Sequence, residues 1–134
     1  MSTSPATIDV NPDGKLLLVV DDEFDVLSAY TMLFEYHGFR VRTAGNGAEA
    51  LAAAALETPD IVLSDMMMPV MNGAELCAQW RADPALREVP FILTSAGILR
   101  DDLVLPYDTF FRKPIRFEVL LAEINKLIAA GGQR

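Results

Sequence analysis

The 134-residue chain is long enough for one domain with a single hydrophobic core, and at 51% apolar residues it is too hydrophobic to be disordered. Its formal charge of −8 argues against non-specific binding of nucleic acid through this domain. No run approaches the roughly 20 unbroken apolar residues of a membrane-spanning helix, so we expect no membrane segment and a cytoplasmic location. Cys77 is the single cysteine, which excludes a disulfide framework and a thiolate metal site.

The two ends of the chain differ in composition from its middle. Residues 1–14 are polar, contain two prolines and a glycine, and lack the apolar centre of a secretion signal. We therefore predict a flexible lead-in over 1–14, a folded domain over 15–130 and a short tail over 131–134, with no second domain attached.

The first half of the chain predicts two strands and two helices in alternation. Lys15 to Val20 is apolar after its first residue, as expected of a strand covered on both faces. Phe24 to His37 has apolar residues at helical spacing, and Gly38 is suited to end that helix. Phe39 to Thr43 alternates, which predicts a strand with one wetter face near a sheet edge. An alanine-rich helix follows over residues 48–56.

The second half continues the same alternation. Asp60 to Ser64, Pro90 to Thr94 and Thr109 to Arg112 are typical of short strands, while Asn72 to Arg81 and Phe117 to Ala130 are typical of helices. Five strands alternating with four or five helices imply right-handed crossovers. The sequence therefore predicts an α/β fold, a doubly wound five-stranded parallel sheet with helices on both faces.

Polar side chains follow the predicted strands at the point where each strand ends. They are the pair Asp21 and Asp22, then Asp65, Ser95 and Lys113. The carboxyl ends of parallel strands meet at one edge of a sheet, where open α/β folds bind their ligands. Each residue has an ordinary explanation when taken alone, since an acidic pair can cap a helix and an aspartate can serve in a turn. Their joint occurrence, in order and each after a strand, predicts a functional site.

With this arrangement the chain resembles, over almost its whole length, a CheY-like receiver domain of two-component response regulators. The resemblance implies a flavodoxin-like sheet of order 2-1-3-4-5 and identifies Asp65 as the phosphoacceptor. It also implies that Lys113 pairs with the phosphoryl oxygens and that Ser95 donates a hydrogen bond to one of them. A receiver domain is not an enzyme acting on a separate substrate, and it catalyses only its own phosphorylation and dephosphorylation.

The resemblance further implies a magnesium ion as cofactor. Asp22 would bind it directly, Asp21 through water, and Asp65 and the backbone carbonyl of Met67 would each add an oxygen, the ligand atom that Mg²⁺ prefers. Three neighbouring carboxylates repel one another unless a cation is present, and Lys113 would partly offset that repulsion. The methionines at 66–68 could alternatively suggest a soft-metal site, but core packing by some and a loop position for the others is the favoured interpretation.

The segment between Ser95 and Lys113 departs from the family pattern because it is shorter than usual. Pro106 would end any helix there, so the sequence predicts a fourth helix of about two turns at most. In the family this region belongs to a face through which receivers form dimers or contact target proteins. Whether this protein forms a homodimer is therefore left undecided by the sequence. We predict that some of its apolar residues pack into the core, and that residues 97–107 are the most mobile part of the unphosphorylated domain.

Two further departures concern the response to phosphorylation. Phe110 occupies the family's aromatic switch position, three residues before Lys113, and it lacks a hydroxyl. We therefore expect Ser95 and Phe110 to act as switch residues, with Phe110 responding by packing alone. Met67 and Gly97 stand where some receivers have polar side chains that orient the attacking water.

The resemblance implies a histidine kinase or a histidine phosphotransfer protein as phosphodonor and a downstream protein as target, without direct nucleic acid or membrane contact. An alternative is a receiver-fold docking module that works without phosphorylation, which the shortened segment favours. A phosphatase of the haloacid dehalogenase type is less well supported, because Asp21 is followed two positions on by Glu23 rather than by a second aspartate.

Overall fold

The structure, a computed structural model, describes residues 14–97 and 104–131. The strands are β1 (Leu16–Val20), β2 (Arg40–Ala44), β3 (Ile61–Asp65), β4 (Phe91–Ser95) and β5 (Thr109–Arg112). The helices in these ranges are α1 (Phe24–Tyr36), α2 (Gly47–Leu56), α3 (Gly73–Ala82) and α4 (Phe117–Gly131). The predicted lead-in, apart from Gly14, and the predicted tail, apart from Gly131, lie outside the described residues.

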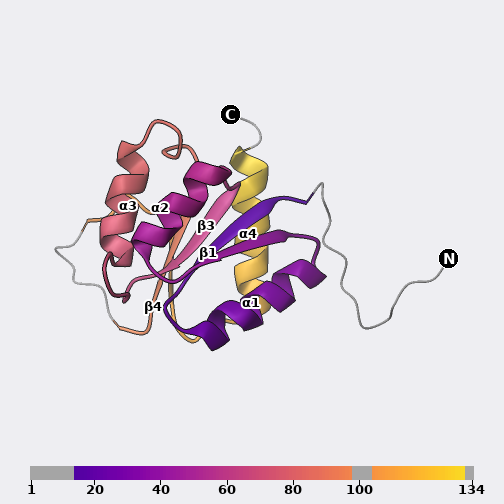
Figure 1. Ribbon diagram of the computed structural model, residues 1–134. Helices are drawn as coiled ribbons and strands as arrows, with labels where there is room; N and C mark the ends of the chain where they lie inside the picture. Colours follow the sequence, from indigo (N-terminus) through magenta and orange to yellow (C-terminus); the bar gives the residue numbers. More distant parts are fainter. Residues whose placement is uncertain (1–13, 98–103, 132–134) are drawn as a thin grey trace.

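The five strands form one parallel sheet in the order β2-β1-β3-β4-β5, which confirms the predicted topology (Figure 1). Leu17 of β1 pairs with Val41 of β2 on one side and with Ile61 of β3 on the other. The strand β2 is at an edge and is only partly buried, as its alternating pattern predicts. The central strands β1, β3 and β4 are buried along their whole length.

The helices cover both faces of the sheet (Figure 1). On one face, α2 and α3 pack against the sheet. Ala50 and Ala54 of α2 and Leu76, Cys77 and Trp80 of α3 belong to the core cluster on this face. On the other face, α1 and α4 pack against the sheet, and Phe34 of α1 with Leu120 and Ile124 of α4 belongs to a second core cluster. The near-continuous apolar runs of the central strands follow from this arrangement, because both faces of those strands are removed from water.

Side-chain caps and one glycine set the helix ends. Asn46 caps α2 by accepting a hydrogen bond from the Glu49 backbone N–H at 2.9 Å. Asn72 and Glu75 form a capping box at the start of α3. After α1, Gly38 adopts a φ of 91°, a left-handed conformation that glycine tolerates without strain. The predicted element boundaries differ from the observed ones by about one residue.

The connection between β4 and β5 has no helix or strand in its described part, residues 96–97 and 104–108. The predicted short fourth helix would lie between Ser95 and Pro106, and residues 98–103 of that stretch lie outside the described range. The prediction that part of this segment packs inward is confirmed, since Leu105 and Tyr107 contact the cluster beneath α2 and α3. Val104 is 90% exposed.

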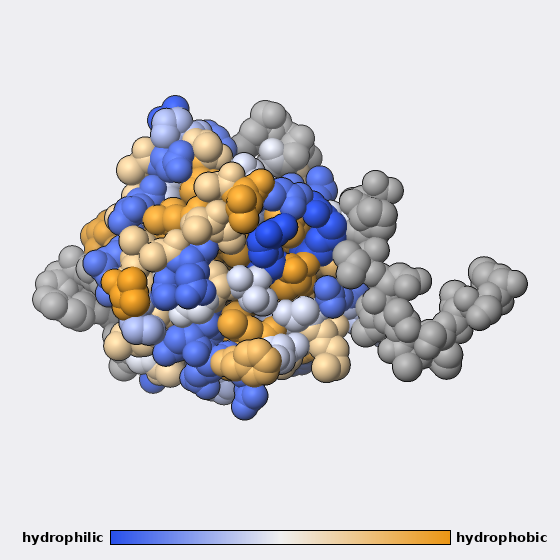
Figure 2. Space-filling view, viewed as in Figure 1, coloured by the Kyte–Doolittle hydropathy of each residue, from blue (hydrophilic) through white to orange (hydrophobic). Residues whose placement is uncertain are grey.

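Hydrophobic side chains on the face seen in Figure 2 are interspersed with hydrophilic ones. None of the helices in the described ranges is both long enough and apolar enough to cross a membrane.

The methionine run is divided as expected, because Met66 and Met68 pack against the core cluster while the side chain of Met67 is 70% exposed. His37 ends α1, and its ring lies 5.4 Å from that of Phe117, so it packs rather than forming part of a polar site.

Candidate functional site at the carboxyl edge of the sheet

The structure brings the predicted site residues together at the carboxyl edge of the sheet. Asp21 and Lys113 directly follow β1 and β5. Asp65 and Ser95 are the last residues of β3 and β4, rather than lying just beyond them as the sequence suggested. Parallel pairing of β1 with β3 and of β4 with β5 aligns these ends, so the sheet register itself places the polar groups side by side.

Three carboxylates form a compact acidic cluster. Asp21, Asp22 and Asp65 each offer an oxygen, and these oxygens all lie within 4.8 Å of one another. Asp21 and Asp65 are buried, whereas Asp22 is exposed. Asp21 is fixed in place because its backbone N–H donates to the Ala44 carbonyl and its Oδ1 accepts the Glu23 N–H at 2.9 Å. The cluster therefore has a fixed buried side and one exposed carboxylate facing water.

Lys113 places a positive charge between the two buried carboxylates. Its Nζ lies 3.4 Å from Asp21 Oδ2 and 3.4 Å from Asp65 Oδ1. Its backbone N–H donates to the Ser95 carbonyl at 2.9 Å, which fixes the lysine beside the end of β4. Burial alone would lower the pKa of the ammonium, but the negative charges of Asp65 and Asp21 outweigh it and the pKa is raised.

Asp65 is the carboxylate most affected by its surroundings. Burial raises its pKa, the charge of Lys113 opposes that rise, and the neighbouring charge of Asp21 adds to it. The net pKa is above the usual range for an aspartate. The folded protein thus holds Asp65 in a setting where its negative charge is not fully compensated, which favours reaction with or binding of a positively charged or electrophilic group.

The predicted switch residues occupy different parts of this edge. Ser95 is buried, and its Oγ accepts the Gly97 N–H at 3.1 Å. Phe110 is partly buried on β5, and its ring centroid lies 5.9 Å from that of Tyr107. Met67 directs an exposed side chain away from the core, so any role at the cluster would come from its backbone.

The loop from β3 to α3 contains a requirement that the sequence did not reveal. A Cβ at Gly73 would lie 2.4 Å from the Asp65 carbonyl oxygen and 2.8 Å from both Leu93 Cδ1 and Met66 Cα. Only glycine allows the start of α3 to approach the end of β3 this closely. Asn72-Gly73 is typical of a turn, and that pattern gives no sign of this contact.

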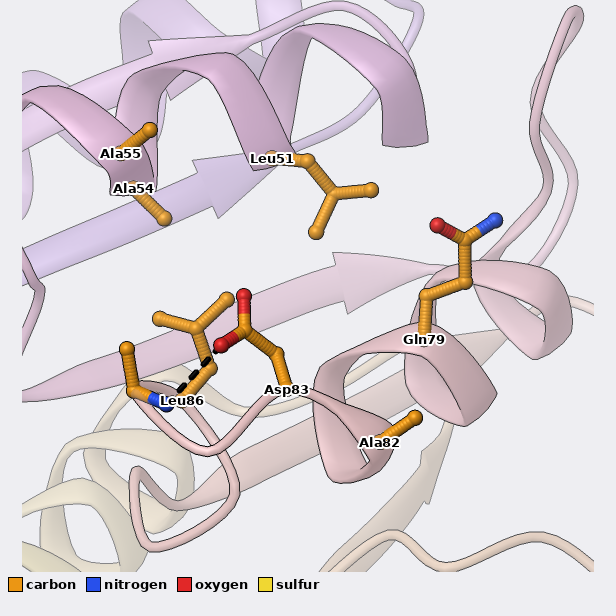
Figure 3. A pocket seen from close by; sticks show the side chains of 8 residues that line it. Leu51, Ala54, Ala55, Gln79, Ala82, Asp83 and Leu86 are labelled. Atoms are coloured by element: carbon orange, nitrogen blue, oxygen red, sulfur yellow. Dashed lines mark hydrogen bonds between the residues drawn. The ribbon is translucent and has the colours of Figure 1, made fainter.

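A hollow between two helices lies apart from the acidic cluster. It is a groove of about 480 Å³ between α2 and α3, and its lining is mostly leucine and alanine (Figure 3). Gln79 and Asp83 add polar groups along its α3 side. None of the acidic cluster lines this groove, so the strand ends, not the groove, are the candidate site.

Response regulators of known name are similar to this chain in sequence. The chain is 34% identical over 113 residues to the DNA-binding response regulator MtrA of Mycobacterium tuberculosis, covering 81% of this chain and 48% of that protein. It thus spans about half the length of the curated relatives it matches. The predicted absence of nucleic-acid contact is not supported by these relatives, because MtrA is described as DNA-binding.

Two solved structures extend the likeness to the fold. A signal receiver domain of a histidine kinase from Syntrophus aciditrophicus has a TM-score of 0.81 and 30% identity, with 87% of this chain and 92% of that one covered. The receiver domain of a sensor histidine kinase from Pseudomonas aeruginosa, described with magnesium coordinated in its active-site cleft, has a TM-score of 0.80 and 25% identity, covering 87% and 98%.

The response regulator receiver domain model matches residues 17–125, a range that contains β2 to β5, all but the first residue of β1, and the acidic cluster. By this match and by its sheet order, the chain belongs to the receiver domain family of two-component response regulators.

Proposed function

We propose that the protein accepts a phosphoryl group on Asp65 from a phosphohistidine and signals through the resulting change of conformation. One observation carries this proposal: three carboxylates and the Lys113 ammonium converge at the strand ends, with Nζ 3.4 Å from both Asp21 and Asp65. In this reaction a bond forms between an Asp65 carboxylate oxygen and phosphorus. The donor's P–N bond breaks, and its electron pair stays on the imidazole nitrogen.

The acidic cluster also fits a magnesium ion. Its carboxylate oxygens are hard ligands, they lie within 4.8 Å of one another, and a single lysine does not neutralise three negative charges. Asp21, Asp22 and Asp65 would hold the ion, with the backbone carbonyl of Met67 as a further ligand. Bound magnesium would neutralise negative charge on the incoming phosphoryl group.

The protein's own residues supply the remaining chemistry. The raised pKa of Asp65 makes its carboxylate, once ionised, a better nucleophile than an exposed aspartate. Lys113 is partly exposed and already lies beside Asp65, so its ammonium can pair with a phosphoryl oxygen on the same carboxylate. Asp21 keeps Lys113 near the site before the phosphoryl group arrives.

Phosphorylation would add roughly 1.5 to 2 negative charges at Asp65. We expect Ser95 to donate its hydroxyl hydrogen to the new group, which a hydroxyl can do while its oxygen still accepts the Gly97 N–H. Lys113 should move with it, because its backbone is hydrogen-bonded to the Ser95 carbonyl. Phe110, three residues before Lys113, would then turn toward the core.

The exposed face of α1 suits a protein phosphodonor. Phe24, Met32, Leu33 and Tyr36 are large apolar side chains that this helix leaves in water. The helix begins two residues after Asp22, so the Phe24 end of this apolar surface lies next to the acidic cluster in the chain. A helix of a histidine kinase or of a histidine phosphotransfer protein could cover it while presenting its phosphohistidine to Asp65.

Incubation with acetyl phosphate and magnesium, followed by intact-protein mass measurement, tests this function. The parent should gain the mass of one phosphoryl group, and Asp65→Asn should gain none. A phosphorylation-independent docking module remains the second candidate, since the described part of the β4–β5 connection has no helix. A parent protein that stays unmodified while Lys113, Asp21 and Asp65 are intact would favour that alternative.

A further inference from the structure

The guanidinium of Arg81, next to the last residue of α3, contacts two separate stretches of chain. Its Nε donates to the Pro106 carbonyl at 2.7 Å, and its Nη2 lies 2.5 Å from Asp108 Oδ2. Its Nη1 donates to the carbonyls of Arg87 at 2.8 Å and Val89 at 3.1 Å. One side chain therefore ties α3 to the approach of β4 and to the approach of β5.

Asp108 extends this connection to the first residue of β4. Its Oδ2 accepts the Phe91 N–H at 2.8 Å while it pairs with Arg81, and its own backbone N–H donates to the Phe91 carbonyl at 2.9 Å. The side chains of Arg81 and Asp108 are 21% and 27% exposed, so the pair is only partly shielded from water, and its forked geometry matters more than its charge. Arg81 and Asp108 together hold the chain just before β5, where the described residues form no helix.

Tyr107 lies between the two residues that Arg81 holds. Pro106 precedes it and Asp108 follows it, so its backbone is anchored on both sides by the same guanidinium. Its ring is partly buried and lies 5.9 Å from that of Phe110, at a 43° angle. The aromatic residue expected to move on phosphorylation thus packs against a ring whose backbone is fixed.

We propose that Arg81 is a positioning residue for the phosphorylation response, a proposal that rests on the proposed phosphorylation of Asp65. Arg81 fixes the backbone around Tyr107, so a turn of the Phe110 ring must displace the Tyr107 ring rather than be absorbed by a shift of the loop. The movement of Phe110 therefore becomes a defined change of the surface beside α3. Without Arg81 the loop moves with Phe110, and the surface change is lost although Asp65 still reacts.

Nuclear magnetic resonance with beryllofluoride and magnesium can test this proposal in the full chain. The variant is Arg81→Gln, which removes the charge and the forked donor. Its matched control is Arg87→Gln, which removes the same charge from an exposed residue whose backbone carbonyl, not its side chain, meets Arg81. Asp108→Asn provides a second variant that keeps an acceptor for the Phe91 N–H. Acetyl phosphate labelling of each protein runs in parallel.

The expected result is labelling of all four proteins at Asp65 to the parent's extent. On adding beryllofluoride, the Tyr107 resonances of Arg81→Gln should shift less than half as far as in the parent and in Arg87→Gln, and Asp108→Asn should fall between. Circular dichroism shows whether Arg81→Gln folds. If it does not, Asp108→Asn decides: a Tyr107 shift smaller than in the parent supports the proposal, and an equal shift overturns it. Parent-like shifts in folded Arg81→Gln overturn the positioning role alone. A parent that neither labels nor shifts overturns the proposed function and this inference with it.

Discussion

The loops that leave β3 and β4 both carry a site residue at their start, yet they are held in different ways. The β3–α3 loop is held by the backbone: the Met66 N–H donates to the Thr94 carbonyl at 2.8 Å, the Gly73 N–H donates to the Met66 carbonyl at 2.9 Å, and the Gly47 N–H donates to the Met71 carbonyl at 3.0 Å. The approach to β5 after the β4 loop is held mainly by two side chains, Arg81 and Asp108, beside one backbone hydrogen bond from the Asp108 N–H to the Phe91 carbonyl.

This difference suggests that the two segments have different roles in the domain. A loop held by backbone groups keeps its geometry through most side-chain substitutions, which suits the residue that must receive the phosphoryl group. A segment whose backbone is fixed by Arg81 and Asp108 can pass the movement of a neighbouring ring on to the surface, which suits a response. The predictions below test the rigid loop first, because the largest effects are expected there.

The largest effect is expected at Gly73. In Gly73→Ala the new Cβ would lie 2.4 Å from the Asp65 carbonyl oxygen, a backbone atom that cannot move aside without shifting β3. We expect a loss of about 3 kcal/mol in the free energy of unfolding, at the upper end of overpacking costs, together with poor phosphorylation of Asp65. Urea unfolding measures the first effect and acetyl phosphate labelling measures the second.

The control for this prediction is Gly131→Ala. A Cβ at Gly131, the last residue of α4, would meet no atom of the described residues within 4 Å. Alanine is also the better helix former, so we expect a change of less than about 1 kcal/mol. Equal losses in the two variants would show that the backbone contact below Gly73 has no special importance.

Removal of the Asp22 carboxylate should weaken magnesium binding more than it changes the stability of the fold. Asp22 is the exposed member of the acidic cluster, so Asp22→Ala should change the unfolding free energy by less than about 0.5 kcal/mol. Phosphorylation at limiting magnesium should need at least about tenfold more of the ion. Titration of magnesium during acetyl phosphate labelling measures this, with exposed Glu23→Ala as the charge-matched control. A parent-like magnesium requirement in Asp22→Ala would exclude it as a ligand.

A smaller effect is expected in the middle of the β3–α3 loop. Val70 has a φ of 67°, which makes it the only non-glycine residue with positive φ in the described ranges, and its side chain is 81% exposed. Since a left-handed conformation costs L-residues about 1–2 kcal/mol and asparagine less, Val70→Asn should stabilise the protein by about 1 kcal/mol. Thermal unfolding can show this, and Val104→Asn, at another exposed valine, should give no comparable gain.

The smallest effect expected is on stability at Asp65, measured without magnesium. Because burial raises the folded-state pKa of Asp65, ionisation of this carboxyl is less favourable in the folded than in the unfolded protein, and the charge lowers stability. Asp65→Asn should therefore be slightly more stable than the parent at neutral pH. The gain should be full above the raised pKa and should vanish as pH falls below the usual aspartate range. A gain that persists at low pH would point to a cause other than charge.

Much of this architecture could be predicted because the signals are local. Buried strands are read from unbroken apolar runs, and the polar residues that follow them, such as Asp21, Asp65 and Lys113, are adjacent in the sequence to the strands that position them. The sheet order and the meeting of these groups then followed from the family resemblance and from parallel pairing.

The features that escaped prediction depend on contacts distant in the sequence. Arg81 is an ordinary basic residue in the last turn of a helix, and its partners lie up to 27 residues further along the chain. The need for glycine at position 73 arises from the Asp65 carbonyl and Leu93, which no local pattern connects to it. Strand ends were also placed one residue early, because Asp65 and Ser95 are polar but still pair with β4 and β5.

The central claim is that Asp65, among three clustered carboxylates, receives the phosphoryl group. Borohydride reduces an aspartyl phosphate to homoserine, so treating the protein after acetyl phosphate and magnesium, followed by peptide mass spectrometry, locates the modified residue. The account predicts homoserine at position 65 alone, in the parent and in Glu23→Ala. Homoserine at position 21 or 22, or modification that survives in Asp65→Asn, would contradict it.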